Sequence, residues 1–154
     1  MNNLDLEVII QNNSLSDYIP SIKKISSWLG HIPDRMIDKY VTIRIVDELE
    51  SKDINLRYRK IDRATNVLAF PSGNMALVEI EEALPLGDLV ICAPLLEKEA
   101  ISENKTLDSH WAHILIHGIL HLIGYDHEQP LKADIMEDLE SRFLLEIGFD
   151  DPYS

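Results

Sequence analysis

The sequence predicts one α+β domain over residues 1–154, in which roughly four strands form a sheet and about five helices pack against it. A length of 154 residues suits a single domain. The composition, 45% hydrophobic and 27% charged, is that of an ordinary globular protein and disfavours intrinsic disorder. Segments with strand-like and helix-like patterns are mixed along the chain, and the longest helical patterns come late, which favours an α+β arrangement.

Four short segments have the pattern of strands. Apolar residues alternate with other residues over 4–10, and again over 41–45. Residues 67–70 run into a Pro-Ser-Gly-Asn turn, and residues 89–92 follow Gly87. Each segment has the length of one strand in a common sheet.

Five segments have helical signals. They cover residues 14–30, 47–56, 94–102, about 108–123, and the chain after Pro130. Ser16 or Asp17 can cap the first helix, and Asp108 or Ser109 can cap the fourth. Gly124 follows the fourth helix and is expected to end it.

The charge of the chain is acidic and unevenly distributed. With 27 acidic and 14 basic residues, the formal net charge is −13, which disfavours a generic basic nucleic-acid binder. Residues 52–63 nevertheless carry five bases and two acids, whereas residues 126–154 carry nine acids and two bases. The sequence therefore leaves room for a local basic site in an acidic protein.

The chain has no recognisable export or membrane signal. The first ten residues include Asp5 and Glu7 but no Lys or Arg, unlike a secretory signal. The most apolar run, residues 111–123, is 13 residues long and contains three histidines, so it is too short and too polar to span a bilayer. The single cysteine, Cys92, excludes an internal disulfide framework. We therefore expect a cytoplasmic protein without a membrane partner.

Most of the histidines lie close together in the sequence. His117 and His121 are four residues apart, so on a helix both imidazoles can reach one metal ion. His113 extends the series, but it lies roughly 12 Å from His121 along a helix axis, too far for one ion to bind both. Of the two possible pairs, only His117 with His121 adjoins Gly124. A turn at that glycine can bring His127 back as a third ligand.

Three imidazoles suit one zinc ion (Zn2+) per chain, with nickel, copper or iron as substitutes in vitro. Three protein ligands leave one coordination position open, as in catalytic zinc sites. The spacing is that of the metzincin protease motif H-E-x-x-H-x-x-G-x-x-H, but Gly118 stands where those enzymes carry their general-base glutamate. We expect a metzincin-like zinc site on a central helix and the following turn, without peptide hydrolysis by that mechanism.

The sequence around these histidines resembles that of a known family. Residues 117–127 match every fixed position of H-G-x-L-H-L-x-G-Y-D-H, the signature of the YbeY family of bacterial metal-dependent endoribonucleases in ribosomal RNA maturation. Residues 55–59 (N-L-R-Y-R), 65–71 (T-N-V-L-A-F-P) and 87–91 (G-D-L-V-I) resemble three further family segments. The resemblance covers most of the chain from about residue 40 onward.

The resemblance implies three zinc ligands, which fall on His117, His121 and His127. It also implies an important arginine, which falls on Arg59. A guanidinium suits a scissile phosphate, because it donates two parallel hydrogen bonds and balances developing negative charge. The alternative for Arg59 is a structural ion pair with Asp62 or Asp88.

Four further positions bear on the site. His113, one turn before the ligands, is a candidate general base, and a metal-bound hydroxide is the other candidate. Asp126, next to His127, is expected to hold a ligating imidazole in place through a hydrogen bond. Asn66 and Ala69 stand where the family has Asp and Ser. Neither is an expected ligand, and an amide at position 66 can still form hydrogen bonds.

The combined expectation is a zinc-dependent endoribonuclease of single-strand type that acts in 16S rRNA 3′-end maturation and ribosome quality control. Its expected partners are ribosomal RNA, the small ribosomal subunit and the assembly factors of that subunit, whose proximity would offset the acidic charge. Two alternatives are a non-catalytic assembly factor with structural zinc, and a zinc hydrolase of another ester or amide. Gly118 and the segment 55–63 favour the nuclease over the second alternative.

Overall fold

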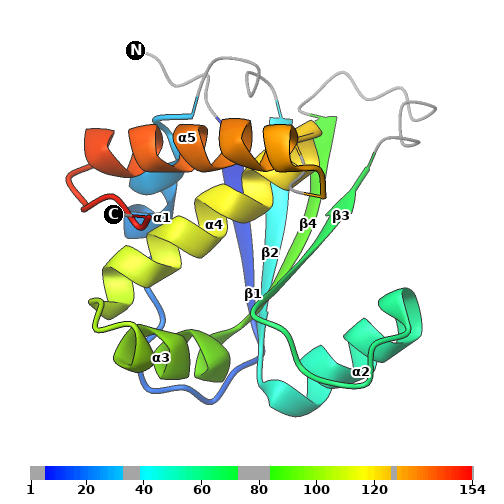
Figure 1. Cartoon of the computed structure of the whole chain (residues 1–154). Coiled ribbons are helices and arrows are strands. Elements are labelled where there is room, and N and C mark those ends of the chain that lie inside the picture. Colours follow the sequence, from blue (N-terminus) through cyan, green and yellow to red (C-terminus); the bar gives the residue numbers. More distant parts are fainter. Residues whose placement is uncertain (1–5, 33–38, 73–83, 126–127, 154) are drawn as a thin grey trace.

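The computed structural model describes residues 6–32, 39–72, 84–125 and 128–153 (Figure 1). The strands are β1 (Glu7–Asn12), β2 (Lys39–Val46), β3 (Val67–Pro71) and β4 (Leu84–Cys92). The helices are α1 (Ile22–Leu29), α2 (Glu48–Arg59), α3 (Ala93–Ser102), α4 (Leu107–Ile123) and α5 (Pro130–Glu146). The predicted α+β class is confirmed, with four strands and five helices in the described ranges.

The four strands form one mixed sheet in the order β1-β2-β4-β3. β2 pairs in parallel with both β1 and β4, whereas β3 runs antiparallel to β4. Because β3 stands at the end of this order, its outer edge has no strand partner in the described chain. Backbone N–H and C=O groups along such an edge are available to other partners.

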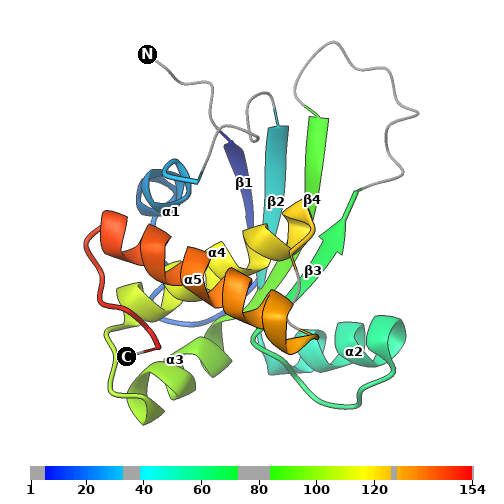
Figure 2. The same ribbon diagram turned by 45° about the horizontal axis from the view of Figure 1, so that its top comes forward.

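Helix α4 crosses one face of the sheet and forms the centre of the core. Trp111, Leu115 and Ile119 on this helix are fully buried. Figure 2 shows α1, α3 and α5 gathered around α4 on the same side of the sheet. The most apolar run of the sequence is therefore a core helix. No helix among the described residues is both long and apolar enough to cross a membrane.

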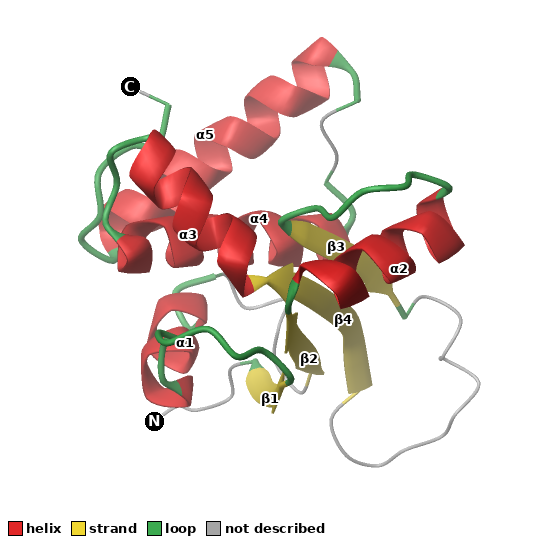
Figure 3. Cartoon of the chain, turned by 90° about the horizontal axis from the view of Figure 1, so that it is seen from below, coloured by secondary structure: helices red, strands yellow, loops and turns green. Residues whose placement is uncertain are grey.

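Helix α2 lies on the opposite face of the sheet (Figure 3). Ile54 of this helix packs against a second, smaller apolar cluster, formed by Val46, Leu68, Val90 and Cys92. Cys92 is a buried free thiol, and burial raises its pKa, so the neutral form is favoured. The sheet is thus covered on both faces, by four helices on one and by α2 on the other.

The first predicted helix begins too early. Its expected range was 14–30, but α1 starts only after Ser21, whose hydroxyl accepts a hydrogen bond from the backbone N–H three residues further on. Ser16 and Asp17, the predicted caps, are therefore wrong. Pro20 accounts for the difference, because a proline disfavours helical conformation in the residue before it.

The N-terminal cap of α4 and the end of α2 also differ from the prediction. Thr106 caps α4 by accepting a hydrogen bond from the N–H of Ser109, so Asp108 and Ser109 lie inside the first turn. Helix α2 continues about one turn beyond residue 56, to Arg59, and Lys60 ends it in the left-handed conformation with φ 63°. This extra turn carries Arg59 to the edge of the sheet.

Candidate active site

A cavity of about 450 Å³ lies along the outer edge of β3. Elements far apart in the sequence meet there, namely the end of α2, the loop after it, β3 and the second half of α4. The lining consists of Tyr58, Arg59, Thr65, Asn66, Val67, Leu68, Ala69, Phe70, His117, Gly118, His121 and Glu128. The structure therefore places Arg59, His117 and His121 around one cavity.

His117 and His121 lie one turn apart on α4, with ring centroids 4.8 Å apart and ring planes at 78°. One metal ion can reach two imidazoles at this spacing. Gly124 ends the helix with φ 119°, as predicted, and its N–H bonds to the carbonyl oxygens of His121 and Leu120. His127 lies outside the described residues. Within those residues, no group of three or more His, Cys, Asp or Glu side chains could hold a metal.

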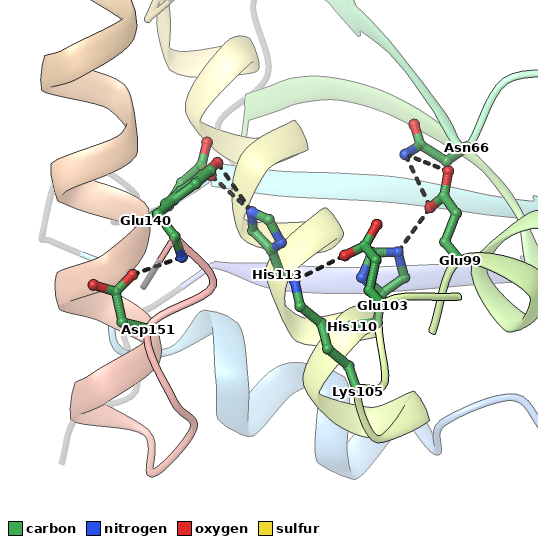
Figure 4. A network of polar contacts seen from close by, with 9 residues as sticks. Asn66, Glu99, Glu103, Lys105, His110, His113, Glu140 and Asp151 are labelled. Carbon is green, nitrogen blue, oxygen red and sulfur yellow. Dashed lines mark hydrogen bonds and ion pairs between the residues drawn. The ribbon is translucent and has the colours of Figure 1, made fainter. Parts of the chain in front are cut away.

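Glu140, on α5, contacts two of the histidines of α4, His113 and His117. It is fully buried, and its Oε2 lies 2.6 Å from Nδ1 of His117. Its Oε1 lies 2.9 Å from Nε2 of His113 and also accepts a hydrogen bond from the hydroxyl of Tyr153. Figure 4 shows Glu140 beside His113, with a dashed line between them.

Glu140 is ionised in this setting. Burial raises the pKa of its carboxyl, but hydrogen bonds from His113 and His117, attraction to the charge of His117, and the Tyr153 hydroxyl together lower it to about 2. A carboxylate can only accept hydrogen bonds, so Nδ1 of His117 must donate. In neutral His117 the lone pair then lies on Nε2.

Glu140 is not among the site residues expected from the sequence, since it is 23 positions from His117 and lies in an acidic helix. One sequence pattern could have pointed to Glu140. Met136, Phe143 and Leu144 are buried on α5, and Glu140 stands on the same stripe at helical spacing. A carboxylate in a buried apolar stripe requires a partner, which here comes from the histidines of α4.

His113, one of the candidates for the general base, does not line the cavity. Its side chain is 13% exposed, and its Nε2 contacts Glu140 and, at 3.2 Å, the hydroxyl of Tyr153. Its Nδ1 is buried and has no hydrogen-bond partner among the residues that the structure describes. His113 therefore contacts Glu140 and does not face the cavity that Arg59, His117 and His121 line.

Arg59 is the last residue of α2 and is exposed at the cavity. Among the described residues no ion pair includes Arg59. Asp62, one of its predicted partners, lies 3.7 Å from Lys52. Asp88, the other, lines a different cavity on the far face of the sheet. An exposed guanidinium without an acidic partner is available to an anion.

Asn66 lines the cavity and is held by a chain of hydrogen bonds that leads into the core (Figure 4). Its side-chain amide donates to both carboxylate oxygens of Glu99, at 3.2 Å each. Glu99 also contacts Nε2 of His110 at 2.7 Å, and His110 is 2% exposed. Burial raises the pKa of Glu99, but the hydrogen bonds from His110 and Asn66 outweigh it and lower the pKa overall.

Gly118 lets α4 approach the sheet closely. A Cβ at this position would lie 2.8 Å from Cδ2 of Leu89 and 3.4 Å from Cγ2 of Val67. The Cβ of a glutamate at position 118 would overlap the side chain of Leu89 in the packed face of the sheet. The residue that acts as general base in metzincins therefore does not fit at this position without a shift of Leu89. The predicted absence of that protease mechanism therefore has a steric reason as well.

Paired imidazoles and an arginine that forms no ion pair within the described residues, facing one cavity, are features of an enzyme that acts on an anionic ester. Comparison with known proteins agrees. The family model described as Endoribonuclease YbeY matches residues 6–148. An Endoribonuclease YbeY from Cellvibrio japonicus is 46% identical over 149 residues, which are 96% of this chain and 82% of that protein.

A solution structure of a Thermotoga maritima protein is also similar, with a TM-score of 0.56 and 27% identity, covering 90% of this chain and 89% of the other. The chain therefore belongs to the YbeY family of endoribonucleases. This membership confirms the predicted resemblance and supports a nuclease hydrolase with RNA as its substrate.

Proposed function

We propose that this protein is a zinc-dependent endoribonuclease that cleaves single-stranded regions of ribosomal RNA in the cytoplasm. Its substrate would be the 3′ end of 16S rRNA, presented with the small ribosomal subunit and its assembly factors. The observation that carries the proposal is the cavity that Arg59, His117 and His121 line together. Membership of the YbeY family supports the RNA substrate.

The proposed metal site consists of His117, His121 and His127, holding one zinc ion. Because Nδ1–H of His117 donates a hydrogen bond to Glu140, His117 would bind the ion through Nε2. When bound, the ion would supply Lewis-acid polarisation of a phosphoryl oxygen. Asp126 stays a candidate for orienting the ring of His127, and both residues lie outside the described part of the chain.

Arg59 is proposed to bind the scissile phosphate. Its guanidinium can donate two parallel hydrogen bonds to phosphate oxygens and balance the negative charge that develops during cleavage. Within the described chain no ion pair has to be broken before it does so. The basic residues around the end of α2 would attract RNA locally, although the chain as a whole carries a net charge of −13.

The proposal is tested by metal content and RNA cleavage measured on the same preparations. We expect His117→Ala to lose bound zinc and cleavage of a ribosomal RNA precursor. Arg59→Ala should keep zinc and lose cleavage. His31→Ala and Arg142→Ala are matched controls, since both residues are exposed and neither lines the cavity.

Cleavage that is equal in wild type, His117→Ala and Arg59→Ala would overturn the nuclease assignment. If His117→Ala then also unfolded on losing its zinc, the alternative of an assembly factor with structural zinc would explain the protein better.

A further inference from the structure

We propose that Tyr58 and Phe70 form a stacking platform for an unpaired RNA base next to the scissile phosphate, and that a second cavity beneath α2 receives this base. The inference rests on the proposed nuclease function and adds a binding site for a nucleobase, separate from the histidines and from Arg59.

The second cavity has a volume of about 780 Å³ and lies between α2 and the face of the sheet opposite α4. This volume is within the range of small-molecule sites, roughly 300–1,000 Å³. Its lining consists of Gln11, Thr42, Arg44, Glu50, Asp53, Ile54, Arg57, Tyr58, Phe70, Asp88 and Val90. It therefore has room for a base and its ribose.

Tyr58 and Phe70 are the residues that connect the two cavities, because both line each of them. Their ring centroids are 5.4 Å apart and their planes meet at 70°, an edge-to-face contact. Phe70 lies on the edge strand β3, and Tyr58 directly precedes Arg59 on α2. A chain whose phosphate lies at Arg59 therefore passes this pair on its way to the second cavity.

The exposure of Tyr58 fits a stacking role. The residue is 62% exposed although its ring packs against Phe70. An aromatic ring packed on one neighbour and open elsewhere can stack with a base of any sequence, as in proteins that bind single-stranded nucleic acids. Paired bases are already stacked inside a duplex, so the ligand that fits this exposed ring is an unpaired base.

The polar groups of the second cavity fit a base better than a phosphate. Arg44 pairs with Glu50 at 2.6 Å, and Arg57 pairs with Asp53 at 2.8 Å, so their charges largely compensate. Asp88 adds a further negative charge to the lining. Such a surface repels a phosphate but offers both donors and acceptors, which is what the edge of a nucleobase requires.

The test is a double-mutant cycle, in which the ring of Tyr58 and the base that it is proposed to contact are removed separately and together. Wild type and Tyr58→Leu are compared for binding and cleavage of an RNA oligonucleotide spanning the cut, and of two copies lacking the base on one side or the other of the scissile phosphate. We expect Tyr58→Leu to weaken binding of the intact RNA on the order of 10- to 100-fold, as one lost stacking contact would. Wild type should bind the copy that lacks the stacked base more weakly than the intact RNA, by a similar factor. Tyr58→Leu should bind this copy and the intact RNA with nearly the same affinity.

Two further variants keep the test specific. Tyr58→Phe retains the ring and should restore most of the binding that Tyr58→Leu loses. Leu49 lies on the same helix, is 85% exposed and lines neither cavity, so Leu49→Ala should leave binding unchanged. Zinc content should be equal in all variants.

The outcomes separate this inference from the nuclease proposal. Wild type that neither binds nor cleaves intact RNA would overturn both. Wild type that cleaves, but tolerates both abasic copies or loses affinity independently of Tyr58, would overturn the stacking platform alone. Loss of binding in Tyr58→Phe would also overturn it, because that variant keeps the ring.

Discussion

Replacing Glu140 by glutamine should affect stability and metal binding together. The carboxylate is 0% exposed and accepts hydrogen bonds from His113, His117 and Tyr153. An amide of the same shape keeps one acceptor oxygen and turns an NH2 group toward a neighbouring donor. At least one buried donor then loses its partner, which costs about 1–3 kcal/mol, and the remaining hydrogen bonds lose their charge assistance. We expect Glu140→Gln to lower the free energy of unfolding by roughly 2–4 kcal/mol.

The same change should weaken zinc binding by about 10- to 100-fold, because the partner that orients the ring of His117 is altered. Urea unfolding measures the stability, and competition with a chelator measures the affinity for zinc. Glu146→Gln is the matched control, an exposed glutamate near the end of the same helix. If Glu140→Gln stayed within about 0.5 kcal/mol of wild type with unchanged zinc affinity, the role assigned to this carboxylate would be refuted.

Three further predictions concern the surroundings of the site. The pKa of Asp108 is lowered despite its partial burial, by hydrogen bonds from Lys24 and Tyr18. Its stabilising effect is therefore present above its unfolded pKa of 3.8 and is lost as the pH falls through the lower folded value. Asp108→Asn should reduce the loss of stability between about pH 6 and about pH 3, measured by urea unfolding. Gly118→Ala should destabilise the protein by about 1–3 kcal/mol in the same assay, because its Cβ meets Leu89 at 2.8 Å. Asn55 is buried and donates to the carbonyl oxygen of Arg63 at 2.8 Å. Asn55→Ala should therefore loosen the loop after Arg59 and raise the KM for RNA more than it lowers kcat.

Much of the secondary structure was predictable because it depends on neighbouring residues. Alternation of apolar residues located parts of β1 and β2, turn and glycine signals located parts of β3 and β4, and capping residues, prolines and apolar periodicity located the helices. The spacing of His117 and His121 and the turn at Gly124 are also local properties. The start of α1 was missed because Ser21 competes with Ser16 and Asp17 for the same role, and only the backbone geometry before Pro20 decides between them.

The candidate site depends on contacts that local patterns do not encode. Arg59 and His117 belong to helices on opposite faces of the sheet, and they meet because α2 continues by one turn to the edge at β3. Glu140 joins the histidines through the packing of α5 on α4, and Tyr58 meets Phe70 across the same sheet edge. Residue type and spacing along one helix are local, so the sequence alone could propose candidate side chains such as His117 and His121. Which of them share a cavity was decided by the way the helices pack on the sheet, which depends on side chains distant along the chain.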